Sequence, residues 1–269
     1  MISSLVIGNT SIDILDDSTE QLGGSVAYVS NLLVKADQNV TVISSFGRDY
    51  PTEIFDPSIK SIFSLSNVTT KFKVSYKDLL REMCLVSRAD HLDLRFLKRK
   101  KIHDDVIFFV PILDEINILD TKDILRNNKD VFSASIPQGW IRNFNQRKIK
   151  IDFSLLSEFP CFDLIFFSHE EISSAKIDLS ILLKLSKILV ITHGDKGSTI
   201  FSSNKTINIP AHKAKVIDSI GAGDIYAGIF IDVYLKTKNL EKAGKAASKI
   251  SSKSTEISGL EGLKNYLKI

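Results

Sequence analysis

Residues 215–228 read KVIDSIGAGDIYAG, and this stretch decides the fold class. A β-branched run ends at Asp218, a glycine turn follows, and a long apolar pattern of helical period begins at once. Such a turn leaves the amides of Gly221, Ala222 and Gly223 at a helix start, where unpaired N–H groups and the helix dipole favour an anion. Asp224 falls in the first helical turn, beside that anion. The stretch therefore predicts a strand–turn–helix unit that holds an anion next to a proton acceptor.

The glycine turn does not match two other loops that bind phosphate groups. A Walker A loop needs G-x-x-x-x-G-K-[ST], which the chain does not contain. A dinucleotide-binding loop needs a third glycine where Tyr226 stands. A purely structural alternative stays open on the loop alone: Asp224 satisfies first-turn amides and stabilises the helix by about 0.5–2 kcal/mol.

Outward from this stretch, short apolar runs alternate with helical patterns. Continuous β-branched and aromatic runs are typical of strands covered on both faces, and their alternation with helices indicates an α/β sandwich. We expect three α/β/α layers around a central, mostly parallel sheet, with strands near 4–7, 40–43, 106–110, 131–135, 164–167 and 188–192. Helices are expected after the Gly23-Gly24 pair, over 221–236 and 240–253, and after Gly259.

Two stretches predict β-hairpins instead. One pairs residues 69–76 with 81–87 and would form a flap over a site, and the other pairs 198–202 with 205–209. The chain contains no Pro/Gly-rich linker and no internal repeat. The simplest partition is a single domain over 1–269, with a short β-hairpin flap around 69–88.

Composition restricts the class of protein. With 43% hydrophobic and 25% charged residues over 269 positions, the chain is expected to fold around a sizeable core. A formal net charge of +3 disfavours a dedicated nucleic-acid binder. The basic run at 98–101 is interpreted as a solvated surface, with nucleic-acid binding as the alternative. Two cysteines without a C-x-x-C motif, and no apolar run of about 18 residues, favour a cytoplasmic protein without a membrane partner.

At residues 218–224 the sequence DSIGAGD resembles the D-[TS]-x-G-A-G-D signature of the ribokinase-like (PfkB-type) carbohydrate kinases. Further matches follow in that family's order, and the resemblance runs from about Val6 to about Gly259. They are Asp13 after the first strand, the Gly23-Gly24 pair, the Gly47-x-Asp49 turn and the Thr192-x-Gly194-x-x-Gly197 loop.

The resemblance implies an ATP-dependent kinase that phosphorylates a hydroxyl of a small polyol, sugar or nucleoside. It implies that Asp224 is the general base and that Gly221, Ala222 and Gly223 form the anion hole for the transferred phosphoryl group. Glu171 would help to place Mg²⁺, through water. The nucleotide would be bound by Thr192, Gly194, Gly197 and Asp218, and the acceptor by Asp13, Gly23 and Gly24.

The chain departs from that family at several points. Ser168 stands where the family's N-x-x-E motif has Asn, which leaves Mg²⁺ placement open. Tyr28 stands where the family often has Asn on the acceptor side. Because the stretch from Asp13 to Gly24 is short, a reduced β lid is expected in place of a large four-stranded one.

These departures, together with QGWIR at 138–142, resemble the myo-inositol kinase-like branch. Arg142 is placed to reach a phosphate or acceptor oxygen, and a surface arginine is the alternative. Two other functions stay open: a nucleoside kinase, and a non-catalytic ligand-binding protein on the same fold. We expect a monomer or a homodimer.

Overall fold

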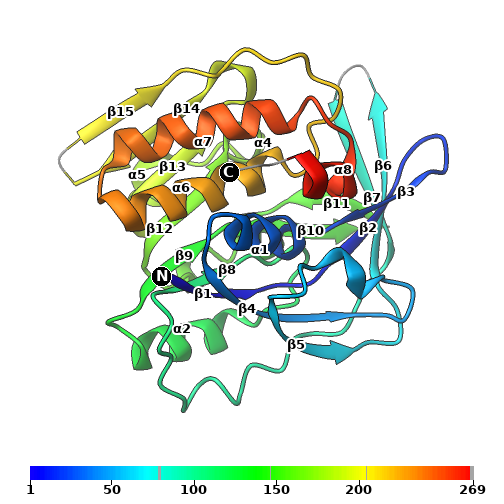
Figure 1. The fold of residues 1–269 in the computed structure, drawn as a ribbon, viewed down its shortest axis with the longest axis horizontal. Coiled ribbons are helices and arrows are strands. Elements are labelled where there is room, and N and C mark those ends of the chain that lie inside the picture. The colour runs from blue at the N-terminus through cyan, green and yellow to red at the C-terminus, as the bar shows by residue number, and fades with distance from the viewer. Residues whose placement is uncertain (78–79, 146, 204, 267–269) are drawn as a thin grey trace.

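The computed structural model describes residues 1–77, 80–145, 147–203 and 205–266. Its centre is a nine-stranded sheet in which seven neighbouring strands are parallel and a hairpin closes one edge (Figure 1). In spatial order the strands are β15 (Lys205–Ile209), β14 (Ser198–Ser202), β13 (Ser186–Thr192), β12 (Phe162–Ser168), β9 (Phe132–Ser135), β8 (Val106–Phe109), β1 (Ser3–Ile7), β4 (Asn39–Phe46) and β5 (Lys60–Leu65).

Helices cover both faces of this sheet and complete the three expected layers. On the face turned to the viewer in Figure 1 lie α1 (Ser25–Lys35), α6 (Ala222–Thr237), α7 (Leu240–Ser254) and α8 (Gly259–Tyr266). The other face packs against α2 (Ile118–Asn127), α5 (Leu179–Leu182) and the irregular segment 92–102. Two further short helices, α3 (Gln138–Ile141) and α4 (His169–Ala175), follow strand ends. Buried side chains form one core on each face, as strands covered on both sides require.

A second sheet of six strands stands at one side of the molecule and forms a lid (Figure 1). Its order is β10 (Arg142–Asn145), β11 (Lys148–Ile151), β7 (Leu80–Ser87), β6 (Thr70–Lys77), β2 (Ser11–Ile14) and β3 (Glu20–Gly23). The expected hairpin is present as β6 and β7, and its turn at 78–79 lies outside the described residues. The expectation of a small, reduced lid was wrong, because β2–β3 and β10–β11 pair onto the two sides of that hairpin.

A buried carboxylate joins the loops that leave the parallel strands. Glu115 is 2% exposed, and its oxygens accept hydrogen bonds from the backbone N–H groups of Asn9 (2.9 Å), Ile112 (2.9 and 3.0 Å) and Leu113 (2.7 Å). Asn9 follows β1 and Ile112 follows β8, so one side chain fixes two adjacent strand ends. Charge-assisted bonds of this kind are among the stronger ones in proteins.

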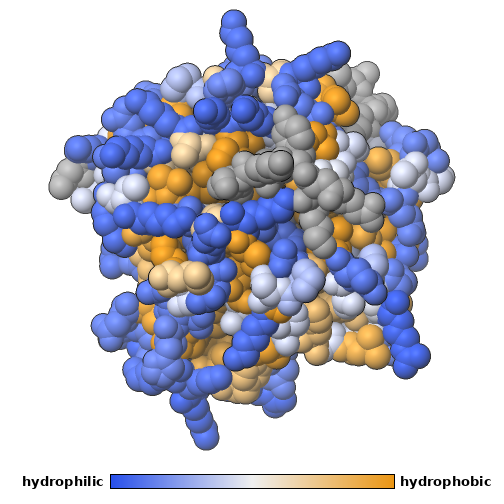
Figure 2. All heavy atoms as spheres, viewed as in Figure 1, coloured by the Kyte–Doolittle hydropathy of each residue, from blue (hydrophilic) through white to orange (hydrophobic). Residues whose placement is uncertain are grey.

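The surface is mixed in character. On the face seen in Figure 2, hydrophilic side chains are interspersed with apolar ones. The basic run at 98–101 is bound to α2: Lys98 forms an ion pair with Asp120, and Lys101 donates to the carbonyl of Asn127 at 2.6 Å. None of the helices in the described residues has the length and hydropathy of a membrane span.

Candidate active site

The site lies at the carboxyl ends of the parallel strands, where three motif segments meet in register. Ser168 at the end of β12 is paired with Thr192 at the end of β13, and Thr192 is paired with Ser198 at the start of β14. The sheet therefore brings the predicted nucleotide loop and the segment that carries Glu171 to one edge. Ligands of open α/β sheets bind at this end of the strands.

The glycine turn forms the N-terminus of α6. Gly221 is the N-cap residue with φ of 78°, and a Cβ at this position would lie 2.5 Å from the ring of Tyr28. The Ala222 amide donates to the Ser219 carbonyl at 3.2 Å, so it is already engaged. Gly223 and Asp224 follow in the first turn, where backbone N–H groups have no acceptor within the helix. A Cβ at Gly223 would meet nothing within 4 Å, so the space in front of this turn is open.

A buried hydrogen bond ties α6 to the strand ends. The hydroxyls of Tyr226 in α6 and Ser198 in β14 lie 2.7 Å apart. Burial raises the pKa of Tyr226 to about 12, so its phenol keeps its proton. Since Ser198 is paired with Thr192, this bond holds the start of α6, with Asp224, beside the predicted nucleotide loop.

That loop depends on two glycines. Gly194 (φ 58°) and Gly197 (φ 95°) both have left-handed backbones, which favour glycine. A Cβ at Gly197 would lie 2.0 Å from the carbonyl oxygen of Ile209, whereas one at Gly194 would meet nothing within 4 Å. Gly197 thus lets the loop pack on the neighbouring strand, and Gly194 presents open backbone.

Glu171 and Ser168 form a capping box at the start of α4. The Ser168 hydroxyl accepts from the Glu171 N–H at 3.2 Å, and the Glu171 carboxylate accepts from the Ser168 N–H at 2.8 Å. Burial raises the pKa of the Glu171 carboxyl, against the opposing effects of that backbone N–H and of the Arg142 guanidinium. The serine that replaces the family's Asn is therefore an N-cap residue.

Arg142 lies on the Glu171 side of the site. It begins β10, donates to the carbonyl of Ile112 at 3.2 Å, and is close enough to Glu171 to lower the pKa of that carboxyl. The sequence predicts that Arg142 reaches a phosphate or acceptor oxygen, and its guanidinium also acts electrostatically on the predicted Mg²⁺ ligand.

The acceptor side is built where β2, β3 and α1 meet. Asp13 is buried in β2, and its Oδ2 lies 3.6 Å from the position that a Cβ would take at Gly23. Gly24 is the N-cap residue of α1 with φ of 96°, and a Cβ there would lie 2.6 Å from the α-carbon of Thr10. The diglycine therefore allows α1 to begin directly against the strand that carries Asp13.

Tyr28 brings the two sides together. Burial raises the pKa of its phenol above the ordinary value, and the negative charges of Asp224 and Asp13 raise it further. The predicted base and the predicted acceptor ligand therefore lie around one tyrosine, although more than two hundred residues separate them in the sequence.

Asp218 is held by the lid and by α8. Its carboxylate accepts from the Gln21 side chain at 2.8 Å and from the backbone N–H groups of Ile220 (2.9 Å) and Gly259 (3.1 Å). These bonds fix the irregular segment that enters the glycine turn. The expectation of a strand ending at Asp218 was wrong, because the N–H groups of Ile217 and Asp218 donate to the Thr255 carbonyl and not to a neighbouring strand. The predicted contact of Asp218 with the nucleotide stays a prediction.

Comparison with known proteins decides the family. The model of the pfkB family carbohydrate kinases matches residues 127–263, just over half of the chain. This protein belongs to the pfkB family. The matched region contains the Ser168–Glu171 motif, the Thr192–Gly197 loop and the glycine turn. The resemblance inferred from the sequence is confirmed.

Characterised relatives of this pfkB-family kinase act on different acceptors. A nucleoside kinase of Methanocaldococcus jannaschii is 24% identical, over 94% of this chain and 85% of its own. An inositol 3-kinase of Arabidopsis thaliana is 25% identical, over 83% of this chain and 65% of its own. The relatives support a carbohydrate kinase in the broad sense.

Solved structures confirm the fold. A pyrophosphate-dependent kinase of the ribokinase family, complexed with a pyrophosphate analog and myo-inositol, gives a TM-score of 0.81 at 23% identity, over 97% of this chain and 99% of its own. The ribokinase of Thermotoga maritima gives 0.69 at 16% identity, over the full length of both chains. The ribokinase-like architecture expected from the sequence is thus confirmed.

A Mg²⁺ ion bound by this pfkB-family kinase would need ligands besides the protein's own side chains. Within the described ranges, no group of three or more His, Cys, Asp and Glu side chains is placed to hold a metal ion. Mg²⁺ retains water and is commonly held by one or two carboxylates plus substrate phosphates. Glu171, the carboxylate that the sequence predicts for this role, would supply one ligand, and water and the donor's phosphates would supply the others.

Sequence reasoning missed three contributors to the site. Two of them are hydrogen bonds between residues far apart in the sequence, Tyr226 with Ser198 and Gln21 with Asp218. No local sequence pattern predicts such bonds. Tyr28 had a signal, as a departure from the family pattern, but that departure alone predicts no role for it.

Proposed function

We propose that this protein transfers a phosphoryl group from ATP to a hydroxyl of a small polyol or sugar, with an inositol-like acceptor favoured. The observation that carries the proposal is the position of Asp224. It stands in the first turn of α6, at an open glycine-lined helix start, and its charge acts on the same tyrosine as that of Asp13. A carboxylate beside an anion cradle is suited to accept a proton from an attacking hydroxyl.

In the proposed reaction, the acceptor oxygen attacks the terminal phosphorus of the donor. A new O–P bond forms, the bridging P–O bond breaks with its electron pair staying on the leaving oxygen, and the acceptor proton passes to Asp224. First-turn amides of α6, at Gly223 and its neighbours, stabilise the negative charge on the phosphoryl oxygens. A positioned base contributes about 10²–10⁴-fold to such a step, and an anion-hole donor about 10²–10³-fold.

On the donor side, Thr192, Gly194 and Gly197 are proposed to shape the ATP site, with Asp218 at its edge and Glu171 assisting Mg²⁺. A bound Mg²⁺ would neutralise charge on the donor's phosphates. Ribokinases with similar folds are described with ATP or ADP. Because similar structures also include pyrophosphate-dependent kinases, pyrophosphate is the alternative donor to test.

On the acceptor side, Asp13 is proposed to bind hydroxyls, in a pocket whose shape depends on Gly23 and Gly24. Arg142 is proposed to reach a phosphate oxygen, which its electrostatic influence on Glu171 supports. The inositol 3-kinase among the relatives and the myo-inositol complex among similar structures favour a polyol. The nucleoside kinase relative keeps a nucleoside as the second candidate acceptor. We propose that residues 1–269 work as one kinase domain.

The decisive experiment compares the wild type with Asp224→Asn. Turnover is measured with ATP and with pyrophosphate over inositols, sugars and nucleosides, by following ADP or phosphate release that depends on the acceptor. We expect Asp224→Asn to lower kcat by about 10²–10⁴-fold while donor binding, measured by calorimetry, is retained. Asp37→Asn is the matched control, because this exposed aspartate at the end of α1 has φ of 59°, a conformation that asparagine tolerates.

Full turnover in Asp224→Asn would remove the base assignment. Acceptor binding without turnover by the wild type, with either donor, would favour the non-catalytic ligand-binding alternative.

A further inference from the structure

The connection between β7 and β8 is held in place although it contains no helix or strand. It runs from residue 88 to residue 105. Connections longer than about 12–15 residues without secondary structure are uncommon in compact domains, and they are usually functional or disordered. Apolar side chains anchor this one in the core on the α2 face of the sheet, and they are Leu92, Leu94, Leu97 and Ile102. An anchored connection of this length therefore calls for a function.

Two asparagines at the end of α2 hold the second half of the connection. The Asn127 side chain donates to the Lys98 carbonyl at 2.5 Å. The Asn128 side chain donates to the Lys100 carbonyl at 3.3 Å. The ammonium groups of Lys98 and Lys101 also bind to α2. The backbone that carries Lys100 is thus fixed, while the Lys100 side chain lines a pocket beside the connection.

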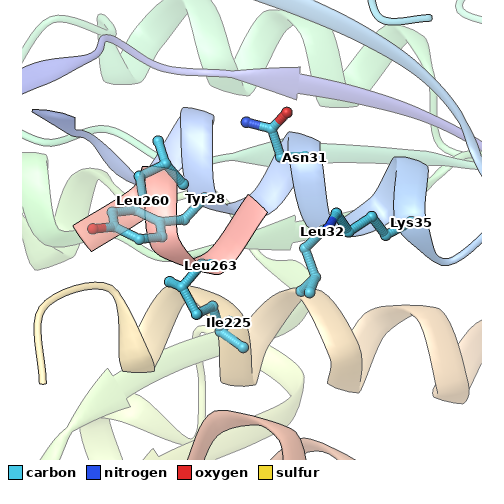
Figure 3. A pocket seen from close by; sticks show the side chains of 7 residues that line it. All are labelled: Tyr28, Asn31, Leu32, Lys35, Ile225, Leu260 and Leu263. Atoms are coloured by element: carbon cyan, nitrogen blue, oxygen red, sulfur yellow. The ribbon is translucent and has the colours of Figure 1, made fainter. Parts of the chain in front are cut away.

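This pocket lies between the connection and strands β1, β4 and β5. Measured out to its mouth it has about 540 Å³, and sites for small molecules commonly have about 300–1,000 Å³. Leu5 and Ile43, which line it, belong to the core on the α2 face, whereas α1 and α6 belong to the opposite face. It is therefore separate from the smaller pocket in Figure 3, of about 270 Å³, which lies among α1, α6 and α8 beside Tyr28.

The floor of the pocket on the α2 face is apolar. Leu5 and Ile43 are each 4% exposed. Ile62 and Phe96 also line the pocket, and they are 41% and 48% exposed. Apolar side chains that lose water when a ligand covers them favour binding. The hollow therefore suits the apolar part of a ligand.

The same pocket is basic. Its remaining charged or titratable lining residues are Lys60, Lys100, Lys101, His103 and Asp104. Burial raises the pKa of the Asp104 carboxyl, and the charges of Lys60 and Lys100 oppose that rise, so both lysines act on one place. Within the described ranges, neither of these two ammonium groups forms an ion pair. Clefts lined by one sign of charge attract ligands of the other sign.

We propose that this pocket is a second binding site, for a small organic anion with an apolar body. The anionic group lies between Lys60 and Lys100. The apolar body covers Leu5 and Ile43 and contacts Phe96. An inorganic anion would leave the apolar floor in water, and an uncharged apolar molecule would leave the two lysines without an anion. The site is independent of the proposed phosphoryl transfer, so its test does not depend on kinase activity.

The probe for this site is 8-anilinonaphthalene-1-sulfonate, an aromatic anion whose fluorescence rises in apolar surroundings. The full chain is titrated with it, as wild type and as the double variant Lys60→Glu/Lys100→Glu. We expect the variant to bind at least about tenfold more weakly, because two attractions become repulsions. The uncharged N-phenyl-1-naphthylamine should bind both proteins equally, since the apolar floor is unchanged.

Lys242→Glu/Lys249→Glu is the matched control. It makes the same change in net charge at two exposed positions of α7, on the opposite face of the sheet. This control should bind the sulfonate probe like the wild type. Thermal unfolding of both double variants should give a Tm close to that of the wild type, because all four lysines are exposed.

Asp104→Asn tests the charge argument with the opposite sign. It removes the carboxyl that lines the pocket and keeps the size of the side chain. The sulfonate probe should then bind about 2- to 10-fold more tightly. If the Lys60→Glu/Lys100→Glu variant does not fold, this variant decides the question alone, and an unchanged affinity overturns the proposal.

The titrations are repeated with excess ATP, because an aromatic anion can also bind at a nucleotide site. Equal affinities of the wild type and Lys60→Glu/Lys100→Glu with ATP present would overturn the proposal. The same conclusion follows if the α7 control loses as much affinity, if the pocket variant loses both probes alike, or if the wild type does not bind the sulfonate.

Discussion

The side-chain amide of Gln21, in lid strand β3, donates a hydrogen bond to the carboxylate of Asp218, just before the glycine turn, over 2.8 Å. The lid is thereby fastened to the segment that positions Asp224. Because the same carboxylate accepts from the N–H of Gly259, the start of α8 is part of the same connection.

Gln21→Ala should loosen the lid. Loss of one hydrogen bond to a carboxylate is expected to raise the acceptor KM about 3- to 12-fold and to speed proteolysis of the lid strands, with little effect on donor KM. Steady-state kinetics and limited proteolysis measure both. Glu20→Ala is the control, since that neighbouring side chain is half exposed and pairs with Lys71 on the surface. An unchanged acceptor KM would show that the bond does not govern lid closure.

Gly221→Ala and Gly223→Ala should have opposite effects on stability. At Gly221 the new methyl group meets the Tyr28 ring at 2.5 Å on a left-handed backbone, so we expect a loss of at least about 1–3 kcal/mol in the free energy of unfolding. At Gly223 the methyl enters open space within a helix, where alanine is favoured by about 1 kcal/mol. Donor affinity should nevertheless fall in Gly223→Ala, because the new methyl group occupies the open space proposed for the donor's phosphoryl group. Urea denaturation and calorimetry check the pair, and equal stabilities would contradict the packing argument.

Glu115→Ala should destabilise the protein by about 2–4 kcal/mol, because three backbone N–H groups lose a buried charged acceptor. Chemical denaturation measures the change. Glu158→Ala offers a matched comparison: its ion pair with Lys122 is half exposed and should contribute less than about 1 kcal/mol. Similar losses in the two variants would mean that Glu115 does not secure the strand ends.

His193 should make stability depend on pH. Partial burial lowers the pKa of its imidazole, and electrostatic interaction with His169 and Lys196 acts in the same direction. The folded state then binds the proton less readily than the unfolded one. The resulting stabilisation is complete above the unfolded pKa of about 6.5 and is lost as pH falls through the lower folded value. His193→Asn should therefore show a smaller Tm decrease than wild type between pH 8 and pH 5, measured by thermal unfolding, and an equal decrease would contradict this role of His193.

The sequence predicted those parts of the fold that local pattern controls. The apolar runs became β1, β4, β8, β9, β12 and β13, and the turn at 221–224 opened a long helix as expected. The lid was underestimated because its assembly is non-local: β2 pairs in parallel with β6, and β11 pairs with β7, across wide gaps in the sequence. Short strands such as Ser11–Ile14 carry too few residues for a period to stand out.

The candidate site, like the fold, could be predicted only where local sequence patterns control it. Motif spacing predicts roles for Asp224, Thr192 and Gly194, whose local structure follows from a turn and its flanking elements. It could not show that the ring of Tyr28 fills the space behind Gly221, or that the Arg142 guanidinium influences the Glu171 carboxyl, because both relationships come from the packing of distant elements.

The lid strands come from three separate stretches, 11–23, 70–87 and 142–151. During synthesis the outer edge of β7 stays unpaired until β11 has been made. More than half of the protein is therefore made before this sheet can be completed. For an engineer, the same interleaving means that transplanting the lid of another kinase would require three coordinated grafts. A single-loop exchange would leave strands without their neighbours.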